Sequence, residues 1–446
     1  MSTRISIRKR KGKKELFGIL CCVFILSVSG CGKESISSGG EQETTAIAEQ
    51  ETTAIAEQET AAASEQKTVK TAEQPPNLEE PHEEEPHEEE SQAEEPQAEE
   101  PEQVISILMV GDILLHTPVE ESAHTQQDTY DFRPIFSELK EEISAADLAL
   151  VNQEVIIGGQ ELGISGYPAF NAPYPIADAL ADAGFDVVCQ ATNHALDKGE
   201  KGVRNDLAYW ESKYPDMVVT GIQDSEERQE MIPTVCVDDV TFAILNYTYG
   251  TNGIPLPQNM PYAVNLLEEE KVKRDLQIAE ETADFTIVCP HWGTEYQLAP
   301  SAEQEYWTNI FLEGGADLVI GTHPHVIQPV EMIQDKGKEM LVYYSLGNFV
   351  NWTSGTGDGV ANRMVGGMAQ IEVARENDDV VIKEYGVKPL ITHVSEGYGG
   401  VRTYALEDYT ASLEQENLIK KQDSNFSLSY AETLCEKVWG EQESLW

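Results

Sequence analysis

GFDVVCQATNHALDKGEKG, residues 184–202, joins a short apolar run to a helical pattern through a polar loop. Phe185–Cys189 is rich in β-branched and apolar residues and predicts a buried strand. Thr192, Asn193 and His194 follow it, and a helix is expected from about residue 202 to 213. A buried strand that leads through a polar loop into a helix is typical of a parallel α/β sheet.

The same alternation continues on both sides of this stretch. Short apolar runs predict further strands, with helical patterns between most of them, at residues 104–110, 148–151, 217–220, 241–247, 285–289, 318–320 and 341–344. The alternating runs at 367–373 and 380–385 have no helix between them and predict a second sheet. Residues 400–446 read as terminal helices without evident chemistry. We therefore expect an α/β fold.

Polar residues recur at the carboxyl end of each buried strand, which is where open α/β sheets place their sites. They occur in the motifs Gly111-Asp112, Asn152-Gln153-Glu154, Asn193-His194, Pro290-His291-Trp292-Gly293 and Gly321-Thr322-His323-Pro324-His325. The chain has only nine His, and four of them fall in these motifs. Each motif alone could be a turn, a helix cap or a packed interior residue. Together they predict a polar functional site.

The residues of these motifs supply oxygen and imidazole ligands but no thiolate: Asp112, Glu154, Asn193, His291, His323 and His325. Such a set disfavours a structural zinc site and suits a hydrolytic centre with Mn, Fe or Zn. A carboxylate flanked by imidazoles is what a two-metal centre requires. The sequence therefore predicts a divalent metal site with one or two ions.

The order of VGDILLH, VNQE, GFDVVCQATNHALDKGEKG, HWGTEY, GADLVIGTHPHVIQ and YYSLGNFV resembles the CapA family of capsule and poly-γ-glutamate synthesis proteins, over about residues 104–395. The resemblance implies the fold of calcineurin-like metallophosphoesterases, a four-layer β-sandwich flanked by helices. It also implies that His194 is the general acid and that the six residues above bind metal. Related phosphoesterases begin with Asp-x-His, whereas this chain has Leu114 two residues after Asp112. One metal site could therefore lack a ligand.

The predicted centre favours a metal-dependent hydrolase that acts on a phosphoester or a γ-glutamyl amide. His194 would protonate the leaving group, and Asp197 would orient its ring. Asn152 and Arg363 are predicted to contact substrate, Arg363 as an anion clamp. The loop at 158–173 is either a substrate-facing wall or an ordinary surface loop. The competing hypothesis is a non-catalytic surface scaffold that binds the polymer or its membrane synthase, which the missing Asp-x-His favours.

The N-terminal residues predict an export signal. A cluster of basic residues precedes the apolar run Leu16–Val28. This run is shorter than the roughly 20 residues of a membrane span and fits a secretory signal. It ends in Ser29-Gly30-Cys31, which resembles a bacterial lipoprotein signal with diacylglycerol attached at Cys31. An uncleaved anchor is the alternative, and both place the body at the extracytoplasmic face of the cell membrane.

Residues 32–103 form an acidic repeat segment. Glu-Gln-Glu-Thr-Thr-Ala-Ile-Ala occurs at 41–48 and 49–56, and Pro-His-Glu-Glu-Glu at 81–85 and 86–90. Few apolar side chains and self-repelling charge predict a disordered linker. The sequence thus divides into a signal at 1–31, a linker at 32–103, an α/β domain at 104–395 and a helical extension at 396–446.

The whole chain has 30 Lys+Arg against 79 Asp+Glu, a net charge of -49, which excludes nucleic acid as a partner. The same charge should repel a polyanion such as poly-γ-glutamate. Binding an anionic envelope polymer would therefore need the metal or a local basic group. Otherwise the substrate is a neutral or lipid-linked precursor.

Overall fold

A computed structural model describes residues 103–127, 129–352, 355–440 and 444–446. The predicted signal at 1–31, its lipidation site Cys31 and all but the last residue of the predicted linker lie outside the described residues. The fold is therefore built from Gln103 onward.

The larger of the two sheets has eight strands in the described residues, in the order β14-β13-β12-β1-β2-β3-β4, with β11 paired to β1. The strands β1 to β4 run parallel to one another, and β12 to β14 join them antiparallel. The strands span β1 Val104–Ile113, β2 Leu148–Gln153, β3 Val187–Cys189, β4 Val218–Thr220, β11 Asn348–Val350, β12 Val365–Glu376, β13 Asp379–Val394 and β14 Val401–Ala405.

The smaller sheet has six strands in the order β5-β6-β7-β8-β10-β9. Its four central strands are parallel, and β5 and β9 pair antiparallel at the two edges. The strands span β5 Thr234–Val237, β6 Val240–Thr248, β7 Phe285–His291, β8 Leu318–Ile320, β9 Val330–Asp335 and β10 Lys338–Tyr343.

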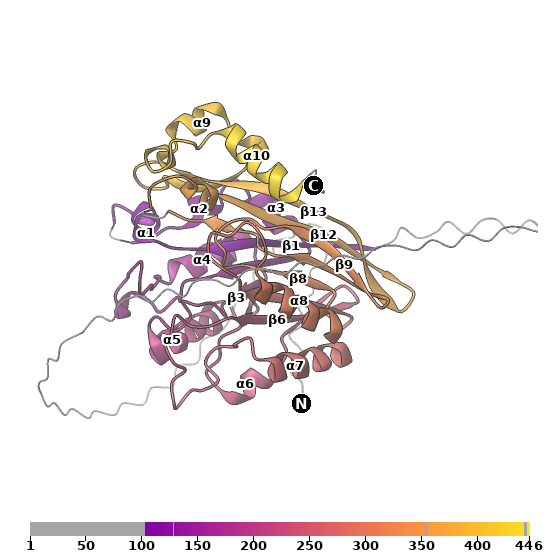
Figure 1. Cartoon of the computed structure of the whole chain (residues 1–446). Helices are drawn as coiled ribbons and strands as arrows, with labels where there is room; N and C mark the ends of the chain where they lie inside the picture. The colour runs from indigo at the N-terminus through magenta and orange to yellow at the C-terminus, as the bar shows by residue number, and fades with distance from the viewer. Residues whose placement is uncertain (1–102, 128, 353–354, 441–443) are drawn as a thin grey trace, which may run out of the picture. The chain divides into compact units, whose positions relative to one another are not determined.

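The two sheets pack against each other through a common apolar core. Cys289 on β7 contacts Met109 on β1, with 3.8 Å between their sulfur atoms. The hydroxyl of Tyr343 on β10 donates to the Gly386 carbonyl oxygen on β13 at 2.8 Å. Figure 1 shows the two sheets stacked between helices, which confirms the predicted α/β sandwich.

Helices cover the outer faces of both sheets. Leu276 of α7 and Phe311 of α8 share an apolar cluster with Val288 and Val319 of the smaller sheet. Helices α2 to α4 contribute to the main core beside β1 (Figure 1). The α-helices span α1 Thr117–Ala123, α2 Arg133–Phe136, α3 Lys140–Ala145, α4 Pro175–Ala183, α5 Gly199–Lys213, α6 Glu226–Glu230, α7 Glu269–Thr282, α8 Ala302–Gly314, α9 Ala411–Glu416 and α10 Leu428–Trp439. None of the described helices is long and apolar enough to cross a membrane.

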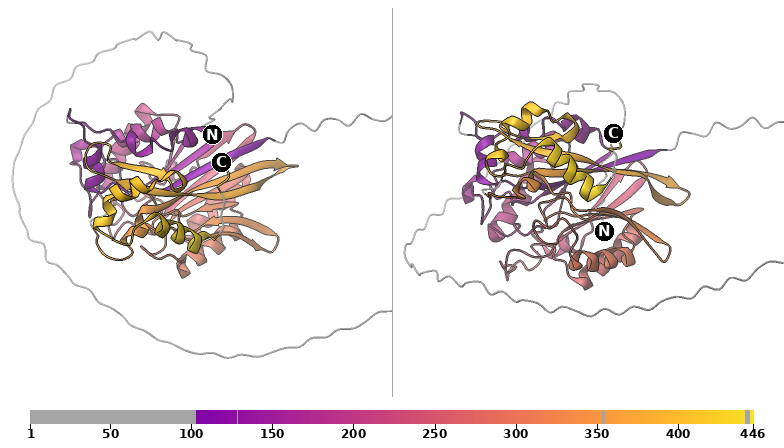
Figure 2. Two further views of the ribbon diagram at one scale, coloured as in Figure 1. Left: turned by 90° about the horizontal axis from the view of Figure 1, so that it is seen from above. Right: turned by 45° about the horizontal axis from the view of Figure 1, so that its top comes forward.

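The sequence pattern predicted that the late strands form a second sheet of their own, and this prediction was wrong. β12 pairs with β1 from Val104↔Ala374 to Val110↔Met368 and so extends the first sheet (Figure 2). The second sheet consists of β5 to β10 instead. Alternation along a chain identifies a strand, but its partner is set by contacts far away in sequence.

The segment 396–446, predicted as a helical extension, also contributes a strand. Its residues 401–405 form β14, which pairs antiparallel with β13 in the larger sheet. The predicted boundary after residue 395 therefore falls between two paired strands. The rest of the segment includes α9 and α10, as expected for terminal helices.

Candidate metal centre

The carboxyl ends of parallel strands from both sheets meet at one place, and the predicted ligands lie there. Asp112 belongs to the end of β1, Glu154 directly follows β2, and His291 is the last residue of β7. Asn193 follows β3, and the two late His follow β8. All six predicted ligands are buried, with at most 5% of the surface of any of these residues exposed. The topology thus brings together residues up to 213 positions apart in the sequence.

Asp112 is held in place by its neighbours on every side. A Cβ at Gly111 would meet the Gly347 carbonyl oxygen at 2.0 Å, so only glycine lets these two segments pass so closely. That approach allows the Asp112 amide to donate to the same oxygen at 3.0 Å. The Asn152 amide donates to Asp112 Oδ1 at 2.8 Å, and the His323 backbone N–H donates to Oδ2 at 3.1 Å. Gly111-Asp112 is therefore part of β1 and positions a carboxylate.

Glu154 stands between the imidazoles. Its Oε1 lies 3.8 Å from His291 Nε2 and 3.6 Å from His325 Nε2. Candidate ligand atoms of Glu154, His291 and His323 lie within 4.8 Å of one another, and so do those of Asp112, Glu154 and His325. Ligand atoms this far apart leave room for an ion bound at about 2.0–2.2 Å from each. The two groups share Glu154, which is the position of a bridging carboxylate.

Amide and hydroxyl groups orient the imidazole rings. Thr322 Oγ1 lies 3.0 Å from His291 Nδ1. The other ring nitrogen, Nε2, faces Glu154 and the predicted ligand Asn193, whose Oδ1 is 2.9 Å away. Asn348 Oδ1 lies 3.0 Å from His325 Nδ1. Partners of this kind fix the ring of a metal-binding His.

Burial controls the protonation of this cluster. It raises the pKa of the Glu154 carboxyl well above its usual range and lowers the pKa of His291 and His323 well below theirs. Burial also acts to lower the pKa of His325, but the Glu154 and Asp112 carboxylates outweigh it and raise that pKa to about 9. Neutral His291 and His323 are in the form that binds a metal ion.

The residues present fit a divalent cation. Both carboxylate oxygens of Glu154 are buried without a hydrogen-bond partner, and so is His323 Nδ1. Leaving a buried polar atom unpaired costs about 1–3 kcal/mol, more for a charged group, and folded proteins rarely do so. Oxygen and imidazole donors around an unsatisfied carboxylate suit Mn, Fe or Zn.

His194 and Asp197 form a pair beside the ligands. Asp197 Oδ2 lies 2.7 Å from His194 Nδ1 and also accepts from the Phe170 amide at 2.7 Å. The Phe170 ring meets the His194 ring edge-on, with 4.6 Å between centroids. The carboxylate therefore lies where it can orient the imidazole, and the segment 158–173 reaches the site through Phe170.

The two residues predicted to contact substrate occupy different surroundings. Asn152 is 1% exposed, and its amide holds Asp112 inside the centre. Arg363 lies in the 3-10 helix η2 (Val360–Met364), with its guanidinium 3.6 Å from the centre of the Tyr296 ring. That ring lies 6.1 Å from His325. Substrate contact by either residue stays a prediction, for which Arg363 is the more accessible.

Two further residues that contact the site, His116 and Tyr249, were not predicted from the sequence. The His116 ring lies 5.1 Å from Phe170. Burial, with repulsion from His325, His194 and Arg363, lowers the pKa of His116 to about 4. Tyr249 packs on His323 with 4.6 Å between ring centroids. His116 is the last residue of the motif VGDILLH, so the sequence contained a pattern that pointed to it. No motif in the sequence pointed to Tyr249.

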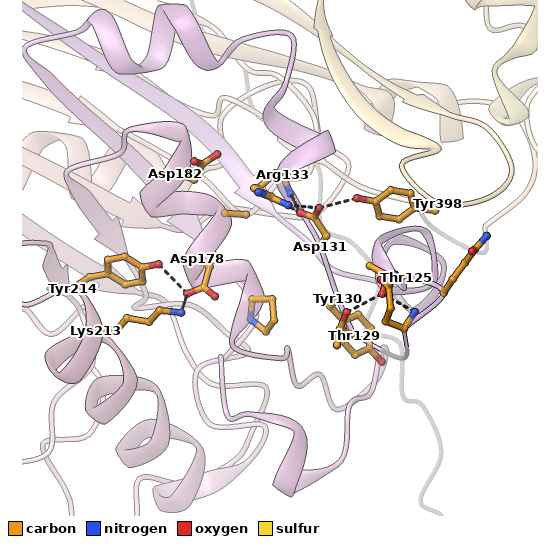
Figure 3. A pocket seen from close by; sticks show the side chains of 14 residues that line it. Thr125, Thr129, Tyr130, Asp131, Arg133, Asp178, Asp182, Lys213, Tyr214 and Tyr398 are labelled. Carbon is orange, nitrogen blue, oxygen red and sulfur yellow. Dashed lines mark hydrogen bonds and ion pairs between the residues drawn. The ribbon is translucent and has the colours of Figure 1, made fainter. Parts of the chain in front are cut away.

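A hollow of about 740 Å³ lies elsewhere on the surface, between α2, α4 and the end of α5 (Figure 3). Its charged side chains are paired with neighbouring groups. Asp131 accepts from Arg133 and Tyr398, and Asp178 accepts from Lys213. None of the predicted site residues lines this hollow. Size alone therefore does not make it the functional site.

A buried carboxyl outside the ligand cluster makes the stability depend on pH. Glu120 in α1 is 3% exposed, and burial, with repulsion from Glu121, raises its pKa from 4.5 to about 8. Since the folded state then binds more protons between these values, the free energy of unfolding falls as the pH rises through that window. E120Q should remove the fall.

We expect E120Q to be more stable than wild type near pH 9 by on the order of 2–4 kcal/mol, and similar to it near pH 4. Urea denaturation at both pH values measures this. A stability difference that is the same at both values would contradict the assignment.

Comparison with known proteins identifies the family. A model of the family described as "Bacterial capsule synthesis protein PGA_cap" matches residues 106–353, more than half of the chain. The chain belongs to the PGA_cap family. This membership confirms the predicted resemblance to capsule and poly-γ-glutamate synthesis proteins. The matched range of the PGA_cap family contains all six predicted ligands together with His194 and Asp197, but not Arg363.

Two curated proteins match the same part of the chain. The PGA biosynthesis protein CapA of Bacillus subtilis (strain 168) is 29% identical over 262 residues, covering 56% of this chain and 65% of that protein. The capsule biosynthesis protein CapA of Bacillus anthracis is 27% identical over 267 residues, covering 56% and 61%. The match to this PGA_cap member thus spans less than two thirds of the length of each relative.

Solved structures similar to this PGA_cap member share little sequence with it. A putative 5'-nucleotidase from Staphylococcus aureus is 15% identical, with a TM-score of 0.40, and covers 64% of this chain and 54% of that chain. The calcineurin-like phosphoesterase YfkN from Bacillus subtilis is 13% identical, with a TM-score of 0.37, and covers 74% and 100%.

Proposed function

We propose that this protein is a metal-dependent hydrolase of the bacterial envelope that serves capsule or poly-γ-glutamate biosynthesis, export or anchoring. The main support for this proposal is the buried Glu154 carboxylate. Its two oxygens lack hydrogen-bond partners and lie among the imidazoles of the predicted ligands. Membership of the PGA_cap family supports the capsule role. Of the described side chains, Glu154 alone leaves two buried polar atoms without a hydrogen-bond partner, and it does so where five strand ends meet.

The site residues would have two roles, metal binding and proton donation to the leaving group. Asp112, Glu154, Asn193, His291, His323 and His325 would hold one or two divalent ions. A bound ion supplies polarisation of the substrate oxygen and lowers the pKa of a water molecule. The Asp197 carboxylate stabilises the protonated ring of His194, whose other nitrogen can then donate a proton to the leaving group. A phosphoester and a γ-glutamyl amide are the two substrate classes that this arrangement suits.

We also propose that the protein works at the cell membrane. The signal-like N-terminus and Cys31 support a lipid anchor on the extracytoplasmic face. The partners would then be the membrane itself, an anionic envelope polymer or its precursor, and the membrane proteins that synthesise the polymer. The acidic repeats at 32–103 would separate the catalytic domain from the membrane surface.

One observation favours a non-catalytic scaffold as the second candidate. The residue two positions after Asp112 is Leu114, which is buried and apolar. The centre therefore lacks the imidazole that related phosphoesterases have there. A scaffold of this kind would keep the fold and bind polymer or synthase without turnover.

Turnover by the metal-loaded protein separates these candidates. We expect the Mn²⁺-loaded full chain to hydrolyse either p-nitrophenyl phosphoesters or a γ-glutamyl anilide, and His323→Ala to lower the rate by roughly 100-fold or more. His393→Ala is the matched control, because His393 is equally buried but contacts Tyr409, outside the centre. Wild-type protein that holds metal yet turns over neither substrate class would leave the scaffold as the better account.

A further inference from the structure

We propose that the C-terminal residues 422–430 build a subsite for an anionic group of the substrate, in which Asp423 positions Arg363. The subsite lies at the edge of the metal centre and takes a carboxylate or phosphate group next to the reacting bond. This inference rests on the proposed function and adds a specificity element to it. Both residues lie beyond the range 106–353 that matches the family.

Asp423 holds the start of the helix that carries Arg363. The side chain of Asp423 is 2% exposed. Its Oδ2 accepts from the amides of Gly359 at 2.9 Å and Ala361 at 3.1 Å. Its Oδ1 accepts from the Asn425 amide at 3.0 Å. One buried carboxylate therefore ties the first turn of η2 to the C-terminal segment.

Further hydrogen bonds from residues 422–430 hold the residues just before and within η2. The Gly357 amide donates to the Gln422 carbonyl oxygen at 2.9 Å. The Tyr430 hydroxyl donates to the Asn362 side chain, and the Asn425 side chain donates to Asp358 at 3.0 Å. The conformation around Arg363 is thus set by C-terminal residues, a role that the sequence did not predict for them.

The other side of Arg363 is joined to the metal centre. Its carbonyl oxygen accepts from Asn348 Nδ2 at 2.9 Å, and the oxygen of the same amide lies 3.0 Å from His325 Nδ1. Its guanidinium lies over the Tyr296 ring. Tyr296 in turn donates its backbone N–H to Pro324, between the two late His, at 2.8 Å. A continuous set of contacts therefore runs from Asp423 to a predicted metal ligand.

The chemistry of this position selects an anion. A guanidinium is permanently charged and binds carboxylate or phosphate through paired N–H donors. The chain as a whole has a net charge of -49 and repels anions at long range. A cation held rigidly beside the centre is what would let an acidic substrate approach it. Asp423 touches no substrate in this account and acts only through the backbone of η2.

The test uses the Mn²⁺-loaded full chain and inorganic phosphate as the probe, with affinity measured by calorimetry. We expect R363A to weaken phosphate binding by about tenfold or more and D423A by a comparable factor. D408A is the control, since Asp408 is an exposed carboxylate outside residues 422–430. Its phosphate affinity should equal that of wild type.

A double variant separates positioning from general destabilisation. If Asp423 acts through Arg363, D423A should cause no further loss in the R363A background. An equal further loss, or wild-type affinity in the D423A single variant, overturns the inference. Tyr430→Phe, which removes only one hydroxyl, provides the same comparison if D423A does not fold.

Metal content measured on the same samples tests the proposed function separately. Protein that holds metal but binds phosphate equally well with and without the Arg363 side chain overturns the inference alone. Protein that holds no metal, yet loses phosphate affinity in R363A, overturns the metal centre and supports the subsite.

Discussion

Glu154→Gln should abolish metal binding while leaving the fold intact. Glutamine has nearly the same shape, but it lacks the charge that both ligand groups share through Glu154. Removing a residue that merely hydrogen-bonds to a metal ligand costs about 10–100-fold in metal affinity. Since Glu154 is itself a predicted ligand, we expect E154Q to lower the metal affinity by roughly 100-fold or more. Elemental analysis of purified wild type and variant measures it.

Thermal unfolding provides a second readout of the same substitution. An ion that binds only the folded state adds about 2.7 kcal/mol at a concentration 100 times its Kd. We therefore expect added Mn²⁺ to raise the Tm of wild type and to leave the Tm of E154Q unchanged. E120Q is the matched control, because Glu120 is also a buried carboxyl but is not one of the ligands. A variant E154Q that still holds a full complement of metal would contradict the assignment.

The second large effect is expected for His194→Ala. If His194 donates the proton to the leaving group, its loss should slow turnover by about 10²–10⁴-fold without changing the metal content. His194 lies beside the cluster and contacts Asp197 and Phe170, whereas the clustered carboxylates and imidazoles come from other residues. Rates and metal content of the same preparations check both statements.

Two further variants test the role of His194 as a proton donor. His124→Ala should keep full activity, because His124 is exposed and lies outside the centre. Asp197→Asn should slow turnover less than His194→Ala does, because the amide can still orient the ring but no longer stabilises its charge. Loss of metal from His194→Ala would show that this residue is a ligand and that the proposed role is wrong.

Local patterns in the sequence were enough to predict the strands and the polar residues that form the metal centre. The run Leu318–Ile320 predicted β8 with the bounds observed, and the polar residues after it led to His323 and His325. The rule that sites lie at the carboxyl ends of parallel strands then grouped residues from five strand ends. Within one sheet the rule needs no knowledge of the strand order, because the carboxyl ends of parallel strands lie at the same edge. The meeting of the two sheet edges is set by the tertiary fold.

Other features depend on contacts that no local pattern encodes. β12 resembles an isolated hairpin strand, yet it pairs with β1 over Val104–Val110. It also lies against the segment before β11, where Gly366 and Gly347 allow two backbones to approach closely. The alignment of Asn348 with Asp112 requires the register between β1 and β11. The role of Asp423 appears only once the C-terminal segment lies beside η2. Pairing over such distances is set by the tertiary fold.

X-ray diffraction from a crystal grown with Mn²⁺, collected where manganese scatters anomalously, tests the central claim most directly. We predict one or two anomalous peaks within bonding distance of Glu154 and of His291, His323 or His325. An ordered cluster without any peak, in a crystal saturated with the ion, would contradict the metal centre and the hydrolase built on it.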